Sequence, residues 1–261
     1  MARSIIEIKL DAFLRKLMCY KLADYFGLYI VTEYPKSGGS WFAQMLGVYL
    51  GVPFTRNRFP IFGSQIMHGH YIDIPNIHNV FCIIRDGRDV MISYYFHSLL
   101  LHDSGDNYQI VNRTKKDLGI YDPTNIHENL PKFIEYKFSR RIHPKFFWNE
   151  FIDSWMNRGI SLIKYEKLVE DTEGVLSEIF SLNLNLKPNS NKIKEVVEKF
   201  RFENVAGRSR GVEKVNSFLR KGVAGDWKEK FNQESKEIFN YFAGDMLIKI
   251  GYEQDDKWVN N

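Results

Sequence analysis

The eight residues YPKSGGSW, from Tyr34 to Trp41, constrain the fold of this chain more than any other segment. The residues before them, Leu28 to Tyr34, are β-branched and aromatic, which predicts a strand. After them, apolar residues recur from Trp41 to Tyr49 at helical spacing. The segment is therefore expected to be a strand-to-helix turn. The first amides of a helix have no acceptor within it and lie at the positive end of its dipole, so such a turn favours an anion.

The composition of this loop suits a phosphate. Gly38 and Gly39 allow close approach of the backbone, and we expect the N–H groups from Ser37 to Ser40 to be free donors. Lys36 adds a positive charge. In the common nucleoside-triphosphate loop, GxxxxGK[ST], the lysine follows the second glycine, whereas Lys36 precedes both glycines. The loop is therefore of a different kind.

A second segment with phosphate-binding chemistry is FCIIRDGRDVMISYYF, from Phe81 to Phe96. Its apolar run predicts a strand that ends at Arg85, and a helical pattern carrying Ser93 follows. An arginine at a strand end offers a planar fork of donors to a phosphate, and a serine in the helix adds a hydroxyl. The neighbouring charged residues are expected to form ion pairs or helix caps: Asp86, Arg88 and Asp89.

Three further segments complete the pattern. FLRKGVAGDWK, from Phe218 to Lys228, contains a basic pair and a glycine: Arg220, Lys221 and Gly222. LIKYEKLVEDTEG carries Tyr165 at the end of a predicted strand, and RFENVAG carries Phe202. Each segment alone has an ordinary structural explanation, since basic loops are usually solvated and lone aromatic residues usually belong to the core. It is the occurrence of all these segments in one order along one chain that indicates a common function.

Together these segments resemble the sulfotransferases that use 3′-phosphoadenosine 5′-phosphosulfate (PAPS). The resemblance implies that Lys36, Ser37, Gly38, Gly39 and Ser40 hold the 5′-phosphosulfate. It implies that Arg85, Ser93, Arg220, Lys221 and Gly222 hold the 3′-phosphate. It also places Trp41, Tyr165 and Phe202 around the adenine, because an aromatic face can hold a base. The product would be adenosine 3′,5′-bisphosphate (PAP), and no metal is expected.

The resemblance also indicates the catalytic residues. IMHGHY, from Ile66 to Tyr71, is similar to the family's IIKTHL segment, which makes His70 the base and puts His68 where the family has a lysine. A histidine suits the role because its pKa lies near neutrality. If the alignment slips by two residues, His68 is the base instead. Lys36 is expected to stabilise the bridging and leaving oxygens.

Two alternative functions stay open. A nucleotide-dependent kinase on the same fold would need a magnesium ligand and the GxxxxGK[ST] loop, and neither is evident. A regulatory module that only binds adenosine 3′,5′-bisphosphate would need no base, so Lys36 together with His70 argues against it. Gly39 is a further departure from the family, because a hydroxyl residue is common at its position.

Length and composition agree with this resemblance but do not decide the fold class. The 261 residues, 44% of them hydrophobic, predict one α/β domain over residues 1–261. The resemblance implies a P-loop-NTPase-like three-layer fold, with a central parallel sheet flanked by helices. The net charge of +4 does not indicate a nucleic-acid partner. Cys19 and Cys82 are expected to be reduced and buried.

The remaining expectations concern partners and location. The βα alternation breaks down between Asp103 and Pro144, and we interpret residues 103–144 as an acceptor-site insert or lid, with many aromatic residues. The acceptor is a hydroxyl-bearing small molecule, carbohydrate or lipid. No apolar stretch is long enough to span a membrane, which predicts a cytoplasmic protein. Ile5 to Tyr25 is amphipathic and lysine-rich, and can contact an anionic membrane surface. The sequence does not indicate the oligomeric state.

Overall fold

The computed structural model describes residues 4–56, 58–75, 78–101 and 106–260, and the chain forms two compact units. The first unit comprises Met1–Ile84 and Ile152–Arg208, and the second comprises Arg85–Phe151 and Ser209–Asn261. That the whole chain is one domain stays a prediction. Asp103, where the expected insert begins, lies outside the described residues.

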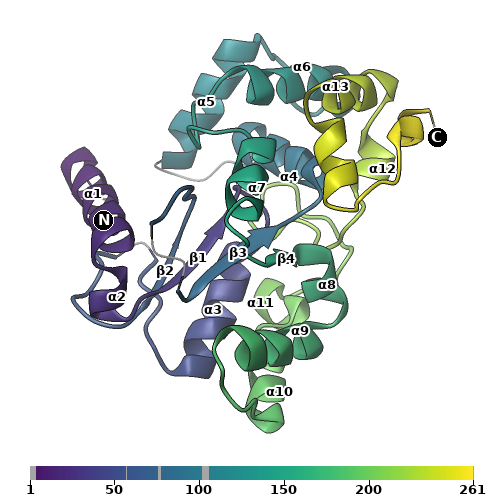
Figure 1. Ribbon diagram of the computed structural model, residues 1–261. Helices are drawn as coiled ribbons and strands as arrows, with labels where there is room; N and C mark the ends of the chain where they lie inside the picture. Colours follow the sequence, from purple (N-terminus) through teal and green to yellow (C-terminus); the bar gives the residue numbers. More distant parts are fainter. Residues whose placement is uncertain (1–3, 57, 76–77, 102–105, 261) are drawn as a thin grey trace. The chain divides into compact units, whose positions relative to one another are not determined.

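The first unit contains a four-stranded parallel sheet in the order β2-β1-β3-β4 (Figure 1). The central strands β1 and β3 pair with Val31 opposite Phe81. Three of the strands were expected from the sequence, and the parallel sheet flanked by helices confirms the predicted fold class. The strands are β1 (Tyr29–Glu33), β2 (Ile66–Gly69), β3 (Val80–Ile84) and β4 (Leu162–Lys164).

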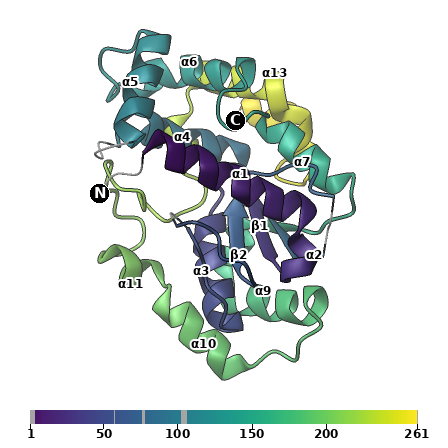
Figure 2. The same ribbon diagram turned by 90° about the vertical axis from the view of Figure 1, so that its left-hand side faces the viewer.

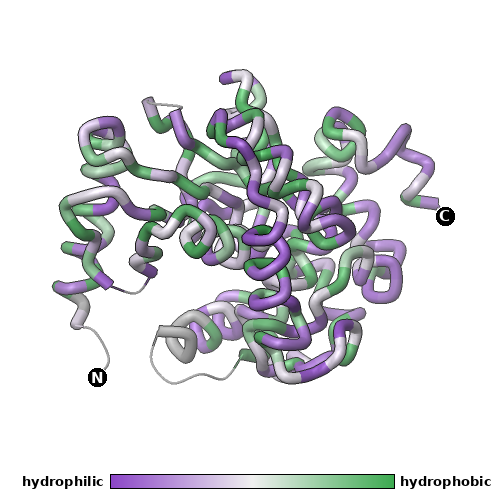
Figure 3. Tube along the Cα trace, turned by 90° about the horizontal axis from the view of Figure 1, so that it is seen from below, coloured by the Kyte–Doolittle hydropathy of each residue, from purple (hydrophilic) through white to green (hydrophobic). Residues whose placement is uncertain are grey.

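One face of this sheet is covered by α1 (Ile5–Lys21), which α2 (Ala23–Phe26) follows. Side chains alternate between the two faces of a strand. The side chain of Met67 in β2 points to the face covered by α1, where its sulfur lies 3.9 Å from the guanidinium of Arg15. Figure 2 shows α1 in front of β1 and β2. Along this helix, next to the N-terminus in Figure 3, hydrophobic and hydrophilic residues alternate within each turn.

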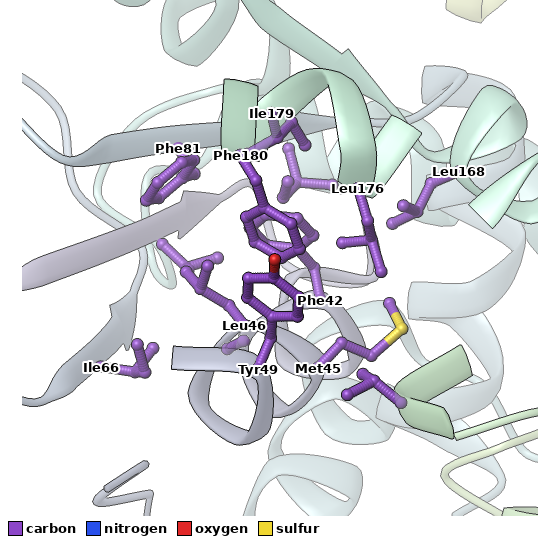
Figure 4. Packing of buried hydrophobic residues seen from close by; sticks show 14 of the residues in the cluster. Phe42, Met45, Leu46, Tyr49, Ile66, Phe81, Leu168, Leu176, Ile179 and Phe180 are labelled. Atoms are coloured by element: carbon purple, nitrogen blue, oxygen red, sulfur yellow. The ribbon is translucent and has the colours of Figure 1, made fainter. Parts of the chain in front are cut away.

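The opposite face of the sheet carries the core of the first unit (Figure 4). Val31 and Phe81 point into it, and the rings of Tyr49 and Phe180 stack with centroids 3.7 Å apart. This apolar burial holds the helix after the loop Tyr34–Gly38 firmly against the sheet. The helices on this face are α3 (Gly39–Leu50), α8 (Tyr165–Glu170), α9 (Thr172–Glu178), η1 (Ile179–Asn183) and α10 (Ser190–Lys199); α11 (Phe202–Ala206) follows α10.

The second unit is helical and has an aromatic core. The ring of Phe138 stacks on Phe242 with centroids 5.3 Å apart and meets Phe239 edge-on. Phe133 meets Tyr95 in the same way. The elements are α4 (Gly87–Leu99), α5 (Asp106–Leu118), α6 (Ile126–Ser139), α7 (Trp148–Met156, whose second half belongs to the first unit), α12 (Trp227–Lys230), α13 (Gln233–Lys249) and η2 (Asp256–Val259).

The structure corrects the expected irregularity between Asp103 and Pro144, because α5 and α6 lie there. The apolar residues of α6 recur at helical spacing and are buried: Leu130, Phe133, Ile134 and Phe138. The basic residues between them obscured this period in the sequence. Phe146 and Trp148, which follow this segment, are buried as well. The role of residues 103–144 as an insert or lid stays a prediction.

Candidate active site

The loop from Tyr34 to Gly38 joins β1 to α3, as the sequence predicts. Gly38 caps the helix with a φ of 94°, and Lys36 also has a positive φ, of 76°. A non-glycine residue rarely adopts this conformation, which costs about 1–3 kcal/mol and is typical of ligand-binding loops. The fully buried Ser37 hydroxyl has no hydrogen-bond partner among the described residues, so a polar group of a ligand would satisfy it.

Tyr165 and Trp41 lie against this loop. A Cβ added to Gly38 would be 2.5 Å from Cδ2 of Tyr165, so the ring leaves room only for glycine. The rings of Trp41 and Tyr165 meet edge-on at 6.4 Å. The Trp41 indole donates to the carbonyl of Phe200 at 2.8 Å, and Phe202, two residues later, is buried at the start of α11. The structure thus brings the loop, Trp41 and Tyr165 together.

Glu33, which the sequence analysis did not select, is the central polar group of this region. Its side chain accepts the Gly39 N–H at 2.7 Å and contacts Nε2 of His68 at 2.8 Å. Burial by itself would raise the pKa of Glu33, but the hydrogen bonds from His68 and Gly39 and the nearby His70 hold it at about 2. Glu33 is therefore an ionised, buried carboxylate. An acid at the end of an apolar strand was the signal in the sequence.

The contact of Glu33 with the loop corrects one expectation. The amides from Ser37 to Ser40 were predicted to be free donors, but Gly39 donates to Glu33 and Ser37 donates to the carbonyl of Tyr34 at 3.3 Å. The cause is a carboxylate at the N-terminus of α3, where the helix dipole stabilises an anion. The chain itself thus supplies one of the anions that this helix end attracts.

The same carboxylate accounts for two departures from the family pattern. A Cβ on Gly39 would be 2.9 Å from Cδ of Glu33, so a larger residue would displace the acid. His68, in the position of a lysine, makes its hydrogen bond to Glu33. Glu33, Gly39 and His68 are therefore one linked group, and a change in any of them affects the other two.

His70 is oriented by the backbone of Glu33. Its Nδ1 lies 2.9 Å from the Glu33 carbonyl oxygen. A carbonyl only accepts hydrogen bonds, so Nδ1 carries a hydrogen, and Nε2 has a lone pair whenever the ring is neutral. In His68 it is Nε2 that carries the hydrogen, because this nitrogen donates to the carboxylate of Glu33. Of the two rings, His70 has the tautomer in which Nε2 can take a proton.

In the second unit, Arg85 meets the late glycine-rich loop. Its Nη2 donates to the Val223 carbonyl at 3.0 Å and to the Asp89 carboxylate at 3.2 Å. Asp89 in turn accepts the N–H of Gly225 at 2.7 Å. Ser93 lies one helical turn beyond Asp89 on α4. The structure therefore brings Arg85 next to Val223, in the loop that contains Gly222, and the binding of a 3′-phosphate by these residues stays a prediction.

The basic pair of this loop is bound to acids. Arg220 pairs with Asp226 and Glu213 and lies 4.4 Å from the centre of the Phe96 ring. Lys221 contacts Asp226 at 2.6 Å, which raises the pKa of Lys221. Burial by itself would raise the pKa of Asp226, but Lys221 and Arg220 outweigh it and lower the pKa. A phosphate would share both cations with Asp226. Gly222 has a φ of 70°.

The charged residues that follow Arg85 have the structural role expected of them. Asp86 caps α4 by accepting the N–H of Arg88 at 2.9 Å, and it also pairs with the Arg88 guanidinium at 2.7 Å. That guanidinium lies over the ring of Trp227, 3.6 Å from its centre. The predicted ion pairs and caps are thus confirmed.

The comparisons with known proteins extend these observations. The sequence model of the family described as sulfotransferase domain matches residues 74–251, more than half of the chain. The chain belongs to the sulfotransferase family. This sulfotransferase is 21% identical over 258 residues to sulfotransferase 1E1 of Cavia porcellus, with 81% of this chain and 80% of that protein aligned. It is 24% identical over 253 residues to the 3-beta-hydroxysteroid sulfotransferase of the same species, at the same coverage.

Solved structures support the fold of this sulfotransferase. Mouse sulfotransferase SULT7A1 complexed with PAP aligns with a TM-score of 0.59 and 15% identity, over 92% of this chain and 95% of that one. Retinol dehydratase in a complex with retinol and PAP aligns with a TM-score of 0.56 and 15% identity, over 90% of this chain and 86% of that one. At these identities the likeness concerns the fold. The expected family and fold class are both confirmed.

Proposed function

We propose that this sulfotransferase transfers a sulfuryl group from PAPS to the hydroxyl of an acceptor, with His70 as the base. The observation that carries the proposal is the hydrogen bond from His70 Nδ1 to the Glu33 carbonyl, which leaves Nε2 with a lone pair. The Glu33 carboxylate also accepts a hydrogen bond from the N–H of Gly39, which follows the loop Tyr34–Gly38. The same residue therefore holds both the base and the end of this loop. A protein that only bound the nucleotide would need no such base.

The described residues fit the donor. The positive charge of Lys36, the unsatisfied Ser37 hydroxyl and the α3 N-terminus with Gly38 and Ser40 suit the 5′-phosphosulfate. Gly39, whose N–H is bonded to Glu33, is proposed to contribute only the close approach of its backbone. Trp41, Tyr165 and Phe202 offer rings for the adenine. In the second unit, the residues proposed for the 3′-phosphate are Arg85, Ser93, Arg220, Lys221 and Gly222. The PAP in the complexes of mouse SULT7A1 and retinol dehydratase supports this choice of nucleotide.

The proposed reaction is an in-line displacement at sulfur. His70 Nε2 takes the proton of the acceptor hydroxyl while the hydroxyl oxygen forms a bond to sulfur. The bond from sulfur to the phosphate oxygen breaks, and the electron pair stays on that oxygen. Lys36 stabilises the charge that develops there, so PAP leaves and the acceptor becomes a sulfate ester.

Glu33 and His68 are proposed to orient this centre. The buried carboxylate fixes the His68 ring and the first turn of α3 at once. His68 is therefore a second polar group beside the base, in place of the lysine of the family. A kinase would require a different loop, since Lys36 precedes both glycines.

The acceptor class is proposed from the relatives and from the second unit. A 3-beta-hydroxysteroid sulfotransferase is among the relatives, and one solved neighbour contains retinol, so lipophilic alcohols should be screened first. Two basic residues within the insert give little support to an anionic acceptor. Lys137 is buried with its ammonium 3.0 Å from the His143 carbonyl, and Arg141 pairs with Glu150.

The decisive experiment is a calorimetric titration with PAP, beside adenosine 5′-monophosphate and ATP with magnesium. A clear preference for PAP would support the donor assignment. A radiolabelled-PAPS assay with steroid, retinoid and phenol acceptors then tests transfer. Binding of ATP with magnesium that equals or exceeds that of PAP would overturn the proposal and favour kinase chemistry.

A further inference from the structure

Helix α1 carries a stripe of apolar side chains that face solvent. Ile6, Leu10, Phe13 and Leu17 recur at steps of four, three and four residues, which places them on one side of the helix. Their exposed fractions are 78%, 47%, 63% and 38%. Scattered apolar residues on a surface need no explanation, but four in one line on a helix indicate a binding surface.

The opposite side of α1 packs against the rest of the first unit. The exposure of the stripe is therefore not a consequence of a loosely attached helix. Arg15 pairs with Asp11 at 2.9 Å and donates to the carbonyls of Thr55 and Arg58. Tyr20 donates its hydroxyl to the Ile72 carbonyl. Asp11, Met18 and Cys19 are buried. These contacts hold one side of α1 inward and leave the stripe outward.

The start of the helix is also defined. Ser4 accepts the Glu7 N–H at 3.2 Å, while the Glu7 carboxylate accepts the Ser4 N–H at 2.7 Å. This capping box stabilises the first turn, which carries Ile6. It also uses the Glu7 carboxylate, the acidic group nearest the stripe in the first turn, in a local hydrogen bond.

Exposed lysines lie beside the stripe. Lys9 and Lys16 each precede a stripe leucine by one residue, and Lys21 follows Leu17 by one helical turn. A second copy packed on this stripe would bring like charges together, which opposes self-association. An anionic surface complements them instead. Apolar residues between lysines are typical of helices that lie in the interface of a membrane.

We propose that α1 binds the surface of an anionic lipid bilayer. The stripe would enter the boundary between head groups and acyl chains, and the lysines would contact the anionic head groups. Within the part of the chain that the structure describes, no helix has both the length and the apolar character needed to cross a bilayer. The proposed contact is thus peripheral. It does not depend on the proposed reaction.

The test is sedimentation of the full chain with phosphatidylcholine vesicles, with and without phosphatidylserine. We expect binding only when phosphatidylserine is present, and weaker binding at high salt. Leu10→Glu should bind about tenfold more weakly or worse, because it removes an inserted side chain and adds a negative charge. The matched control is Leu182→Glu on η1, whose side chain is 74% exposed and should make no difference.

A charge variant keeps the test independent of any effect of Leu10→Glu on folding. Lys9→Gln with Lys16→Gln leaves the stripe intact and should weaken binding several-fold. Circular dichroism and thermal unfolding check that each variant is folded. The proposal is overturned if the wild type does not bind the anionic vesicles or if both stripe and lysine variants bind normally. It is also overturned if sedimentation shows a dimer in solution that Leu10→Glu dissociates, since a second copy would then cover the stripe.

Discussion

Glu33 and His68 form a buried pair, with Oε1 of the acid 2.8 Å from Nε2 of the histidine. Both side chains are about nine-tenths buried or more, and the other oxygen of Glu33 accepts the Gly39 N–H. The pair connects the end of β1, β2 and the start of α3 through one carboxylate. Because a buried ion is costly unless it is fully paired, these contacts are expected to act as a unit.

The pH dependence of stability should report the ionised Glu33. Its pKa is about 2 in the folded protein, against an ordinary value of 4.5. A lowered carboxylate pKa stabilises the protein above the ordinary value, and this contribution is lost as the pH falls from about 4.5 to about 2. We expect a loss of about 3 kcal/mol over this range. Urea unfolding at pH 5 and pH 3 should show a smaller loss in Glu33→Gln than in the wild type; equal losses would contradict the assignment.

Gly39→Ala tests the contact between the loop and the acid. The new Cβ would approach Cδ of Glu33 to 2.9 Å, so the acid must move, at an expected cost of about 1–3 kcal/mol. The matched control is Gly63→Ala, where a Cβ would meet no atom within 4 Å. Denaturant unfolding measures both. Unchanged stability in Gly39→Ala would mean that Glu33 has another position available.

Much of this arrangement was predictable and one part was not. The sequence indicates the loop at Lys36 and Arg85 because each belongs to a local run of residues with a recognisable chemistry, and it indicates the two histidines through the family resemblance of their segment. Glu33 was not selected, because a single acid at the end of an apolar strand does not indicate which residues it contacts. Its meaning comes from Gly39 and His68, and His68 reaches it only through the pairing of β1 with β2. Side-chain contacts across a sheet are not visible in the sequence.

His70→Ala and His68→Ala should separate the base from its neighbour. With the proton acceptor removed, His70→Ala should lower the turnover number by about 100-fold or more while PAP still binds. His68→Ala should reduce turnover less and alter the pH profile, because it removes a partner of Glu33. Steady-state kinetics with radiolabelled PAPS and calorimetry with PAP measure the two effects. Full activity in His70→Ala would move the role of base to His68.

Lys36→Ala and Arg85→Ala should have different effects on the turnover number and on PAP binding. Lys36 is assigned to charge that develops in the transition state, so its loss should mainly lower turnover. Arg85 is assigned to the 3′-phosphate, so its loss should mainly weaken PAP binding, by about 10-fold or more. Turnover and PAP affinity measured for both variants decide the matter. If both variants changed only the affinity for PAP, the role of Lys36 would be wrong.

Lys137 should destabilise the folded second unit to an extent that depends on pH. Burial lowers its pKa from 10.5 to about 7, and its ammonium lies 3.0 Å from the His143 carbonyl and 3.7 Å from the centre of the Tyr94 ring. Between these two pKa values the unfolded chain holds the proton that the folded chain has lost, so the lysine's contribution to stability rises with pH. Lys137→Met, which keeps a similar volume, should be more stable than the wild type at pH 7, and its advantage should shrink toward pH 10. Thermal unfolding of both proteins from pH 7 to pH 10 measures this gap, and a gap that stays constant would show that Lys137 is not buried in the way described.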